Sequence, residues 1–190
     1  MKSLVKKELG PIYQIKISLD DVRPPIWRRI LTPAATTLPK LHQIIQLTMG
    51  WHNSHLHAFQ VGMTTYGDPH PDLDDWMENQ RGVLLSQIAP TQKSKVRYEY
   101  DFGDGWVHTL LVEKILPPEV GQTYPRCMTG RRACPPEDCG GPWGYADFLE
   151  ALTDPEHEQH RELVEWVGED FNPAAFDLNA VNAKLKKVRI

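Results

Sequence analysis

The sequence lacks the features that mark several classes of protein. It has no excess of positive charge, since 21 lysines and arginines stand against 25 aspartates and glutamates, giving a net charge of −4. Binding along a phosphate backbone without sequence preference needs a basic stripe, so this composition disfavours that class. No stretch approaches the roughly 18 apolar residues of a membrane span, and no apolar run follows the charged first ten residues. We therefore expect a cytoplasmic protein with no membrane contact.

Cysteine is also scarce, with three in the chain. In a reducing compartment these are expected to be free thiols or metal ligands rather than a disulfide framework. The sequence has no P-loop, no dinucleotide-binding fingerprint, no G-x-S-x-G motif and no H-E-x-x-H motif. The common signatures of nucleotide binding, serine hydrolysis and zinc peptidases are therefore missing.

What is present predicts a single domain over residues 1–190. Alternating apolar residues indicate strands, Pro39 and Gly50 bracket a helix with an apolar stripe, and three further helical stripes follow residue 143. Strands gather at the front of the chain and helices at the back. This order predicts an α+β fold with a mixed, mostly antiparallel sheet, helices packed on one face and a C-terminal helical segment.

The chain divides into three parts by composition. We expect a strand-rich part at 11–116, a Cys/Pro-rich loop without periodicity at 117–142, and a helical part at 143–188. Within the first part, residues 66–80 indicate a long loop, and residues 83–88 indicate a short strand or a turn.

A β-hairpin is the clearest local prediction. Apolar residues alternate from Val96 to Phe102, and Asp104-Gly105 is the strongest short signal for a two-residue turn. With the turn at those two residues, Asp101 lies directly opposite His108. The predicted apolar face of the hairpin then contains Val96, Tyr98, Tyr100, Phe102, Val107 and Leu111.

The cysteines form the first candidate site. Thiolates are good zinc ligands, and a structural zinc site needs four ligands. Cys127, Cys134 and Cys139 would supply three, and His108 is the first choice for the fourth, with His57 and His160 as alternatives. The competing interpretation is that the three cysteines are small buried apolar residues.

The second candidate site is the pair Asp101 and His108. A carboxylate beside an imidazole orients the ring and raises its basicity, as a metal-dependent hydrolase or nuclease would require. The competing interpretation is that Asp104 only closes the turn and that the pair is an ordinary cross-strand contact.

Two further segments carry ligand-type side chains. His55 and His57 point to the same side of a predicted strand, as two metal ligands would, although a sheet edge of mixed polarity is the preferred interpretation. Carboxylates crowd the 66–80 loop at a density that can bind Ca²⁺ or Mg²⁺, but their spacing does not match an EF-hand and no glycine stands at the required place, so a solvated loop is the preferred interpretation. These carboxylates are Asp68, Asp72, Asp74, Asp75 and Glu78.

Basic residues form three local clusters that would suit a nucleic-acid accessory protein. The last of them is also explained as the solvated end of a helix, where cations suit the helix dipole. The clusters are Arg23, Arg28 and Arg29; Arg126, Arg131 and Arg132; and Lys184, Lys186, Lys187 and Arg189.

Three motifs together resemble the plasmid pRiA4b ORF-3-like family. They are YEYDFGDGWVH at 98–108, ACPPEDCGGPWGY at 133–145, and MGW with HLH at 49–57. The resemblance covers about residues 13–185. It implies an α+β domain associated with plasmids and mobile elements, and it implies no activity. It favours Cys127 and Cys134 over Cys139 as metal ligands, because cysteine is not general at the last position in that family.

The leading hypothesis is a binding or interaction module, accessory to plasmid or mobile-element functions, with a loop held by zinc and a protein or nucleic acid as its partner. The alternatives are a metal-dependent hydrolase or nuclease using Asp101 and His108, and a nucleic-acid accessory protein. A deep cleft where these residues meet would favour an enzyme, and a flat surface would favour binding. The motifs mark the surface to inspect as Trp51, His55, His57, Asp104, Trp106, Glu137 and Asp138.

Overall fold

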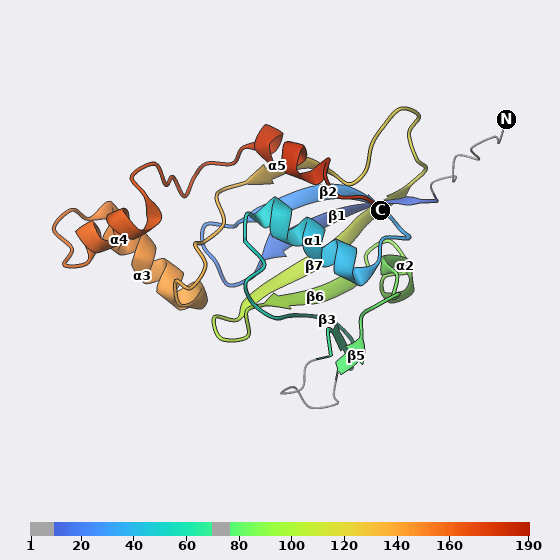
Figure 1. Ribbon diagram of the computed structural model, residues 1–190, viewed down its shortest axis with the longest axis horizontal. Helices are drawn as coiled ribbons and strands as arrows, with labels where there is room; N and C mark the ends of the chain where they lie inside the picture. Colours follow the sequence, from blue (N-terminus) through green and yellow to red (C-terminus); the bar gives the residue numbers. More distant parts are fainter. Residues whose placement is uncertain (1–9, 70–76) are drawn as a thin grey trace.

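The computed structural model describes residues 10–69 and 77–190, and its centre is one eight-stranded sheet (Figure 1). The strand order is β5-β4-β3-β6-β7-β1-β2-β8, with every neighbouring pair antiparallel except β4 and β5. The strands are β1 Ile12–Leu19, β2 Trp27–Pro33, β3 His57–Val61, β4 Thr64–Gly67, β5 Met77–Asn79, β6 Lys95–Tyr100, β7 Trp106–Leu116 and β8 Arg126–Arg131. The predicted α+β fold is confirmed.

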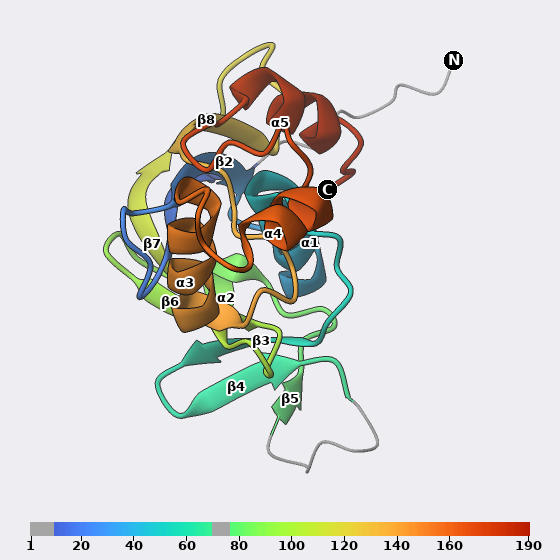
Figure 2. The same cartoon turned by 90° about the vertical axis from the view of Figure 1, so that its left-hand side faces the viewer.

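One face of the sheet is buried because its central strands alternate. In β1, Ile15, Ile17 and Leu19 are buried, while the residues between them are partly exposed. The helix α1 (Leu38–Met49) lies across this buried face (Figures 1 and 2). Pro39 falls in its first turn, and Gly50 ends it with a left-handed backbone, φ 111°.

The β6–β7 hairpin exists, but its predicted register is wrong. Tyr98 pairs with His108 and Tyr100 pairs with Trp106, so residues 101–105 form the connection. Asp101 adopts a left-handed backbone, φ 58°, and its Oδ1 accepts a hydrogen bond from the Gly103 amide at 3.0 Å. The side chain of Asp101 thus caps a five-residue loop, and Asp101 does not lie opposite His108.

The new register moves residues between the two faces of the hairpin. Trp106, His108 and Leu110 join the buried face, whereas Val107 and Leu111 are only partly buried. Phe102 leaves the face altogether and is exposed in the loop. A shift by an odd number of residues turns every side chain of a strand to the other face, which is why this error matters for the site.

Three further predictions of local structure are wrong. The Cys/Pro-rich loop contains the edge strand β8, residues 83–88 contain the short helix α2 (Leu85–Ile88), and β4 and β5 enter the predicted loop at 66–80. Strand β8 lacks apolar alternation because Cys127 is its only buried residue, and it lies at the edge of the sheet, paired with β2 across a register shift at Arg29/Ile30.

The three C-terminal helices sit in two places (Figure 1). Helix α5 (Leu178–Leu185) packs against β8 and α1, and its Asn182 side chain bonds to both the N–H and the C=O of Cys127, each at 2.9 Å. Helices α3 (Gly141–Thr153) and α4 (His160–Val167) pack on each other at one side of the sheet. Every helix in residues 10–69 and 77–190 is too short or too polar to span a bilayer.

Candidate functional site

The three motif-bearing segments meet at one end of the sheet. His57 pairs with Tyr100, so His55 and Asp101, just beyond the paired residues, come to the same end of β3 and β6. The Asp101 amide donates to the Leu56 carbonyl at 2.9 Å, which ties the two segments together.

The Cys/Pro-rich loop closes over this end. The Glu137 carboxylate accepts from the Tyr100 hydroxyl at 2.7 Å and from the His52 amide at 2.9 Å. The Trp51 indole N–H donates to the Pro135 carbonyl at 3.1 Å. These bonds hold three segments that are far apart in sequence in one arrangement.

His55, Asp101 and Asp138 form the one group in residues 10–69 and 77–190 in which three or more His, Cys, Asp or Glu ligand atoms lie within 4.8 Å of one another. His55 Nδ1 lies 3.6 Å from Asp101 Oδ2, and His55 Nε2 lies 3.2 Å from Asp138 Oδ1. The Nε2 atom is buried yet makes no hydrogen bond of acceptable geometry. The His55 ring therefore lies between two carboxylates, and its Nε2 atom forms no ordinary hydrogen bond with either of them.

The backbone around this group is unusual. Asp101, Asp138 and Asn53 have left-handed φ values of 58°, 60° and 61°. Such conformations are uncommon outside glycine, although Asp and Asn tolerate them best, and they concentrate at functional sites. Both carboxylates are thus presented by residues whose backbone is held in a sparsely populated region.

A polar cavity of about 240 Å³ adjoins the group, and His55 and Asp68 are among the residues that line it. The rings of His42 and His57 stack in its wall with centroids 3.5 Å apart. His42 Nδ1 pairs with the Tyr98 hydroxyl at 2.8 Å, and His57 Nε2 pairs with the Gln80 amide oxygen at 3.1 Å.

The stacked histidines are neutral near pH 7. Burial lowers the pKa of His42 to about 3, with a further lowering by the adjacent His57 ring. Burial also lowers the pKa of His57. The cavity wall therefore offers neutral hydrogen-bonding groups rather than positive charge.

His108 does not belong to this site. It is fully buried, Nδ1 lies 3.1 Å from the Trp106 carbonyl, and its ring meets that of Trp51 edge-on. Burial lowers the pKa of His108 to about 3. Trp106 is likewise buried, and Asp104 accepts a hydrogen bond from the Gly140 amide at 3.2 Å, so both serve packing around the loops.

The cysteines are free thiols, two buried and one partly buried. Burial raises the pKa of Cys127 to about 11 and that of Cys139 to about 12, and it raises the pKa of Cys134 as well. Among the described residues, none of the three belongs to a group of three ligand atoms within 4.8 Å, and His160 Nδ1 instead faces the Ala151 carbonyl. Zinc at the cysteines stays a prediction that this arrangement does not favour.

The acidic loop is only partly described. Asp72, Asp74 and Asp75 lie outside the described residues, Asp68 lines the polar cavity, and Glu78 is exposed on β5. His42 and Gln80 could not be predicted as cavity residues, because a histidine beside a helix stripe and a glutamine in a loop carry no local signal of burial.

Comparison with known proteins identifies the family. The plasmid pRiA4b ORF-3-like protein family matches residues 11–180. The chain belongs to this family. It is 41% identical over 176 residues to the uncharacterized protein y4hQ of Sinorhizobium fredii, covering 92% of this chain and 90% of that protein. It is 37% identical to the protein of unknown function MM3350 from Methanosarcina mazei, whose crystal structure matches with a TM-score of 0.83 over 96% of this chain and 99% of that one.

Proposed function

We propose that this member of the pRiA4b ORF-3-like family is a binding module that holds a divalent cation at His55, Asp101 and Asp138. The observation that carries the proposal is the convergence of these ligand atoms, from three separate segments, within 4.8 Å. One imidazole and two carboxylates are donors that zinc and manganese accept. Three protein ligands leave coordination positions open, which an anionic group of a partner would fill.

The exposure of the group suits binding from solution. The side chains of Asp138, His55 and Asp101 are 72%, 28% and 11% exposed. Asp138 therefore lies at the surface and Asp101 is nearly buried, with His55 between them. An ion would take one nitrogen of the His55 ring and one oxygen from each carboxylate, since ligand atoms of all three residues lie within 4.8 Å of one another. The competing arrangement is a protonated His55 held between two carboxylates with no ion.

A titration of the metal-free protein with Zn²⁺ and with Mn²⁺, followed by calorimetry, tests the proposal. We expect one ion per chain, with affinity at least about tenfold weaker in Asp138→Asn and His55→Gln, because losing even an outer-shell partner of a metal ligand typically costs about 10–100-fold and a direct ligand should cost no less. Asp21→Asn is the matched control, since Asp21 is also exposed and left-handed, φ 59°, and lies outside the group. Absence of binding to the wild type, or equal binding by all variants, contradicts the proposal.

The same titration separates this site from the cysteines. If Zn²⁺ binding survives Asp138→Asn but disappears in Cys134→Ala and Cys139→Ala, the ion belongs to the Cys/Pro-rich loop. In that case the zinc-held loop of the original hypothesis replaces the present site.

Metal-dependent hydrolysis is the second candidate, and the polar cavity beside the group favours it. A substrate seated among His42, His57 and Gln80 would lie next to an ion bound by His55. We rank hydrolysis second because the adjoining histidines are buried, neutral and already paired, and His108 is enclosed in the core. Metal-dependent turnover of phosphoester, ester or peptide substrates that is lost in Asp138→Asn would reverse the ranking.

A nucleic-acid partner has less support. Arg28 is buried, Arg29 pairs with Glu113 at 2.6 Å, and Arg126 bonds to Gln122, so these arginines form no free basic stripe. A role accessory to plasmid functions rests on the family description alone. Retention on a DNA column that weakens steeply with salt would restore this candidate.

A further inference from the structure

Arg28 is a buried cation without a buried anion to balance it. It is 2% exposed on β2, on the same strand face as Ile30, which packs in the core. No carboxylate lies within 4.0 Å of its guanidinium among the described residues. A buried charge is costly unless it is paired, so an unpaired arginine in a well-packed protein requires an explanation.

Two of the three nitrogens of the guanidinium donate hydrogen bonds, and the third, Nη2, does not. Nε donates to the Thr48 carbonyl at 2.7 Å, and Nη1 donates to the carbonyls of Trp27 and Arg131 at 2.9 Å each. The Phe176 ring lies 4.4 Å from its central carbon. Nη2 makes no hydrogen bond in the part of the chain that the structure describes. It is also not one of the fully buried polar atoms that lack a partner. This nitrogen therefore keeps access to open space.

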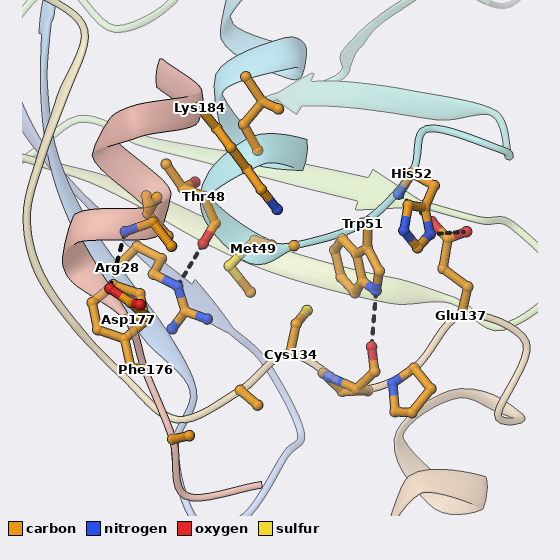
Figure 3. A pocket seen from close by; sticks show the side chains of 18 of the residues that line it. Arg28, Thr48, Met49, Trp51, His52, Cys134, Glu137, Phe176, Asp177 and Lys184 are labelled. Atoms are coloured by element: carbon orange, nitrogen blue, oxygen red, sulfur yellow. Dashed lines mark hydrogen bonds and ion pairs between the residues drawn. The ribbon is translucent and has the colours of Figure 1, made fainter. Parts of the chain in front are cut away.

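The open space is a cavity of about 410 Å³ between the end of α1, the Cys/Pro-rich loop and the segment that leads into α5 (Figure 3). Its apolar lining includes Trp51, Phe171 and Val181. Figure 3 shows the Lys184 side chain extending from α5 into the same cavity. A cavity of this size, mainly apolar with a few polar groups, is typical of small-molecule sites.

The acidic residues of the cavity are already engaged elsewhere. Glu137 accepts from the Tyr100 hydroxyl and the His52 amide. Asp177 caps α5 by accepting from two backbone amides at 2.9 Å each. Burial raises the pKa of the neighbouring Cys134, which keeps its thiol neutral and unable to offset the arginine. These bonds leave both negative charges in place but occupy the two carboxylates, whereas Nη2 of Arg28 has no partner among the described residues.

We propose that this cavity binds a small carboxylate with an apolar body. The carboxylate accepts from Nη2 of Arg28 and pairs with the ammonium of Lys184, while the body packs on Trp51, Phe171 and Val181. Arginine with a free N–H is well suited to a carboxylate, and the apolar wall excludes a ligand that is charged throughout. This site is separate from the cation group and does not depend on it.

Binding of 4-phenylbutanoate, with 4-phenylbutan-1-ol as the uncharged analogue, tests the proposal by calorimetry on the full chain. We expect saturable binding of the acid and at least about tenfold weaker binding of the alcohol, which is the usual effect of losing a charge-assisted hydrogen bond. Lys184→Met should weaken binding of the acid by about twofold to fivefold, which is the usual effect of losing a solvent-exposed ion pair. Lys187→Met is the matched control, because Lys187 is exposed and does not line the cavity.

A variant that fills the cavity gives an independent check without touching Arg28, which also anchors the end of α1. Ala180 lines the cavity and is exposed, so Ala180→Phe should abolish binding, whereas Asn179→Phe, at an exposed residue of α5 about 100° around the helix that does not line the cavity, should not. Equal affinity for acid and alcohol would reduce the site to an apolar groove and overturn the proposal. So would the absence of saturable binding at millimolar acid, or unchanged binding in Ala180→Phe when that variant unfolds at the wild-type temperature.

Discussion

Buried histidines make stability in mild acid a sensitive test of this structure. Burial lowers the pKa of both His42 and His108 to about 3, and each is buried in a polar or aromatic cluster. In the unfolded chain an imidazole takes up a proton near its usual pKa of about 6.5. Below that pH the unfolded chain binds protons that the folded chain does not, so the free energy of unfolding falls as the pH decreases from about 6.5 toward 3.

The size of the effect follows from the two pKa values. Each pH unit below 6.5 removes about 1.4 kcal/mol of stability per such histidine, so each contributes a loss of about 2 kcal/mol at pH 5. His42 and His108 together then remove about 4 kcal/mol, a large part of the 5–15 kcal/mol that holds a typical domain folded.

His108→Leu isolates one of these contributions. The replacement is apolar, sits among Trp51, Tyr98 and Trp106, and removes an Nε2 atom that has no hydrogen-bond partner among the described residues. Urea unfolding at pH 7.5 and pH 5, followed by circular dichroism, should show that the variant loses about 2 kcal/mol less than the wild type between the two pH values. His52→Gln, at a side chain 83% exposed, should behave as the wild type. An equal loss in wild type and His108→Leu would refute the burial of a neutral His108.

Three other perturbations test the packing around the site. Asn182→Ala removes both hydrogen bonds to Cys127 and should lower the free energy of unfolding by about 2 kcal/mol, whereas exposed Asn179→Ala should have little effect in the same urea titration. Gly141→Ala would drive a methyl group into the backbone of the hairpin loop, so it should cost about 1–3 kcal/mol more than Gly62→Ala, where φ is also positive but the space is open; equal effects would disprove the close contact. The buried Cys127 thiol, which does not line the cavity beside Arg28, should react with a thiol reagent only on unfolding, and its reaction in the native protein would contradict its burial.

Local periodicity was enough to predict the central strands, α1 and the helical C-terminus. It failed at the hairpin because Asp101 takes a left-handed backbone and caps a five-residue loop, while Asp104-Gly105 resembles a shorter turn. It failed at β8 because an edge strand with a register shift needs no alternation. These features depend on side-chain capping and on a neighbouring strand, which a local pattern does not contain.

The site was predicted in pieces but not as a whole. His55 and Asp101 were separate candidates, and their meeting follows from the pairing of β3 with β6, a contact between segments about forty residues apart. The cavity arginine was predictable in principle, since Arg28 shares a strand face with Ile30, yet a cluster of three arginines suggested a basic surface instead. A pattern of charge shows which residues are basic, and the register decides which of them face the core.

The position of a bound ion tests the central claim most directly. Crystals of the protein grown with Mn²⁺ or Zn²⁺ and measured at the absorption edge of the metal should show one anomalous peak per chain, within about 2.0–2.3 Å of ligand atoms of His55, Asp101 and Asp138. A peak at Cys127, Cys134 or Cys139 instead, or no peak at His55 with the metal in excess, would contradict the account.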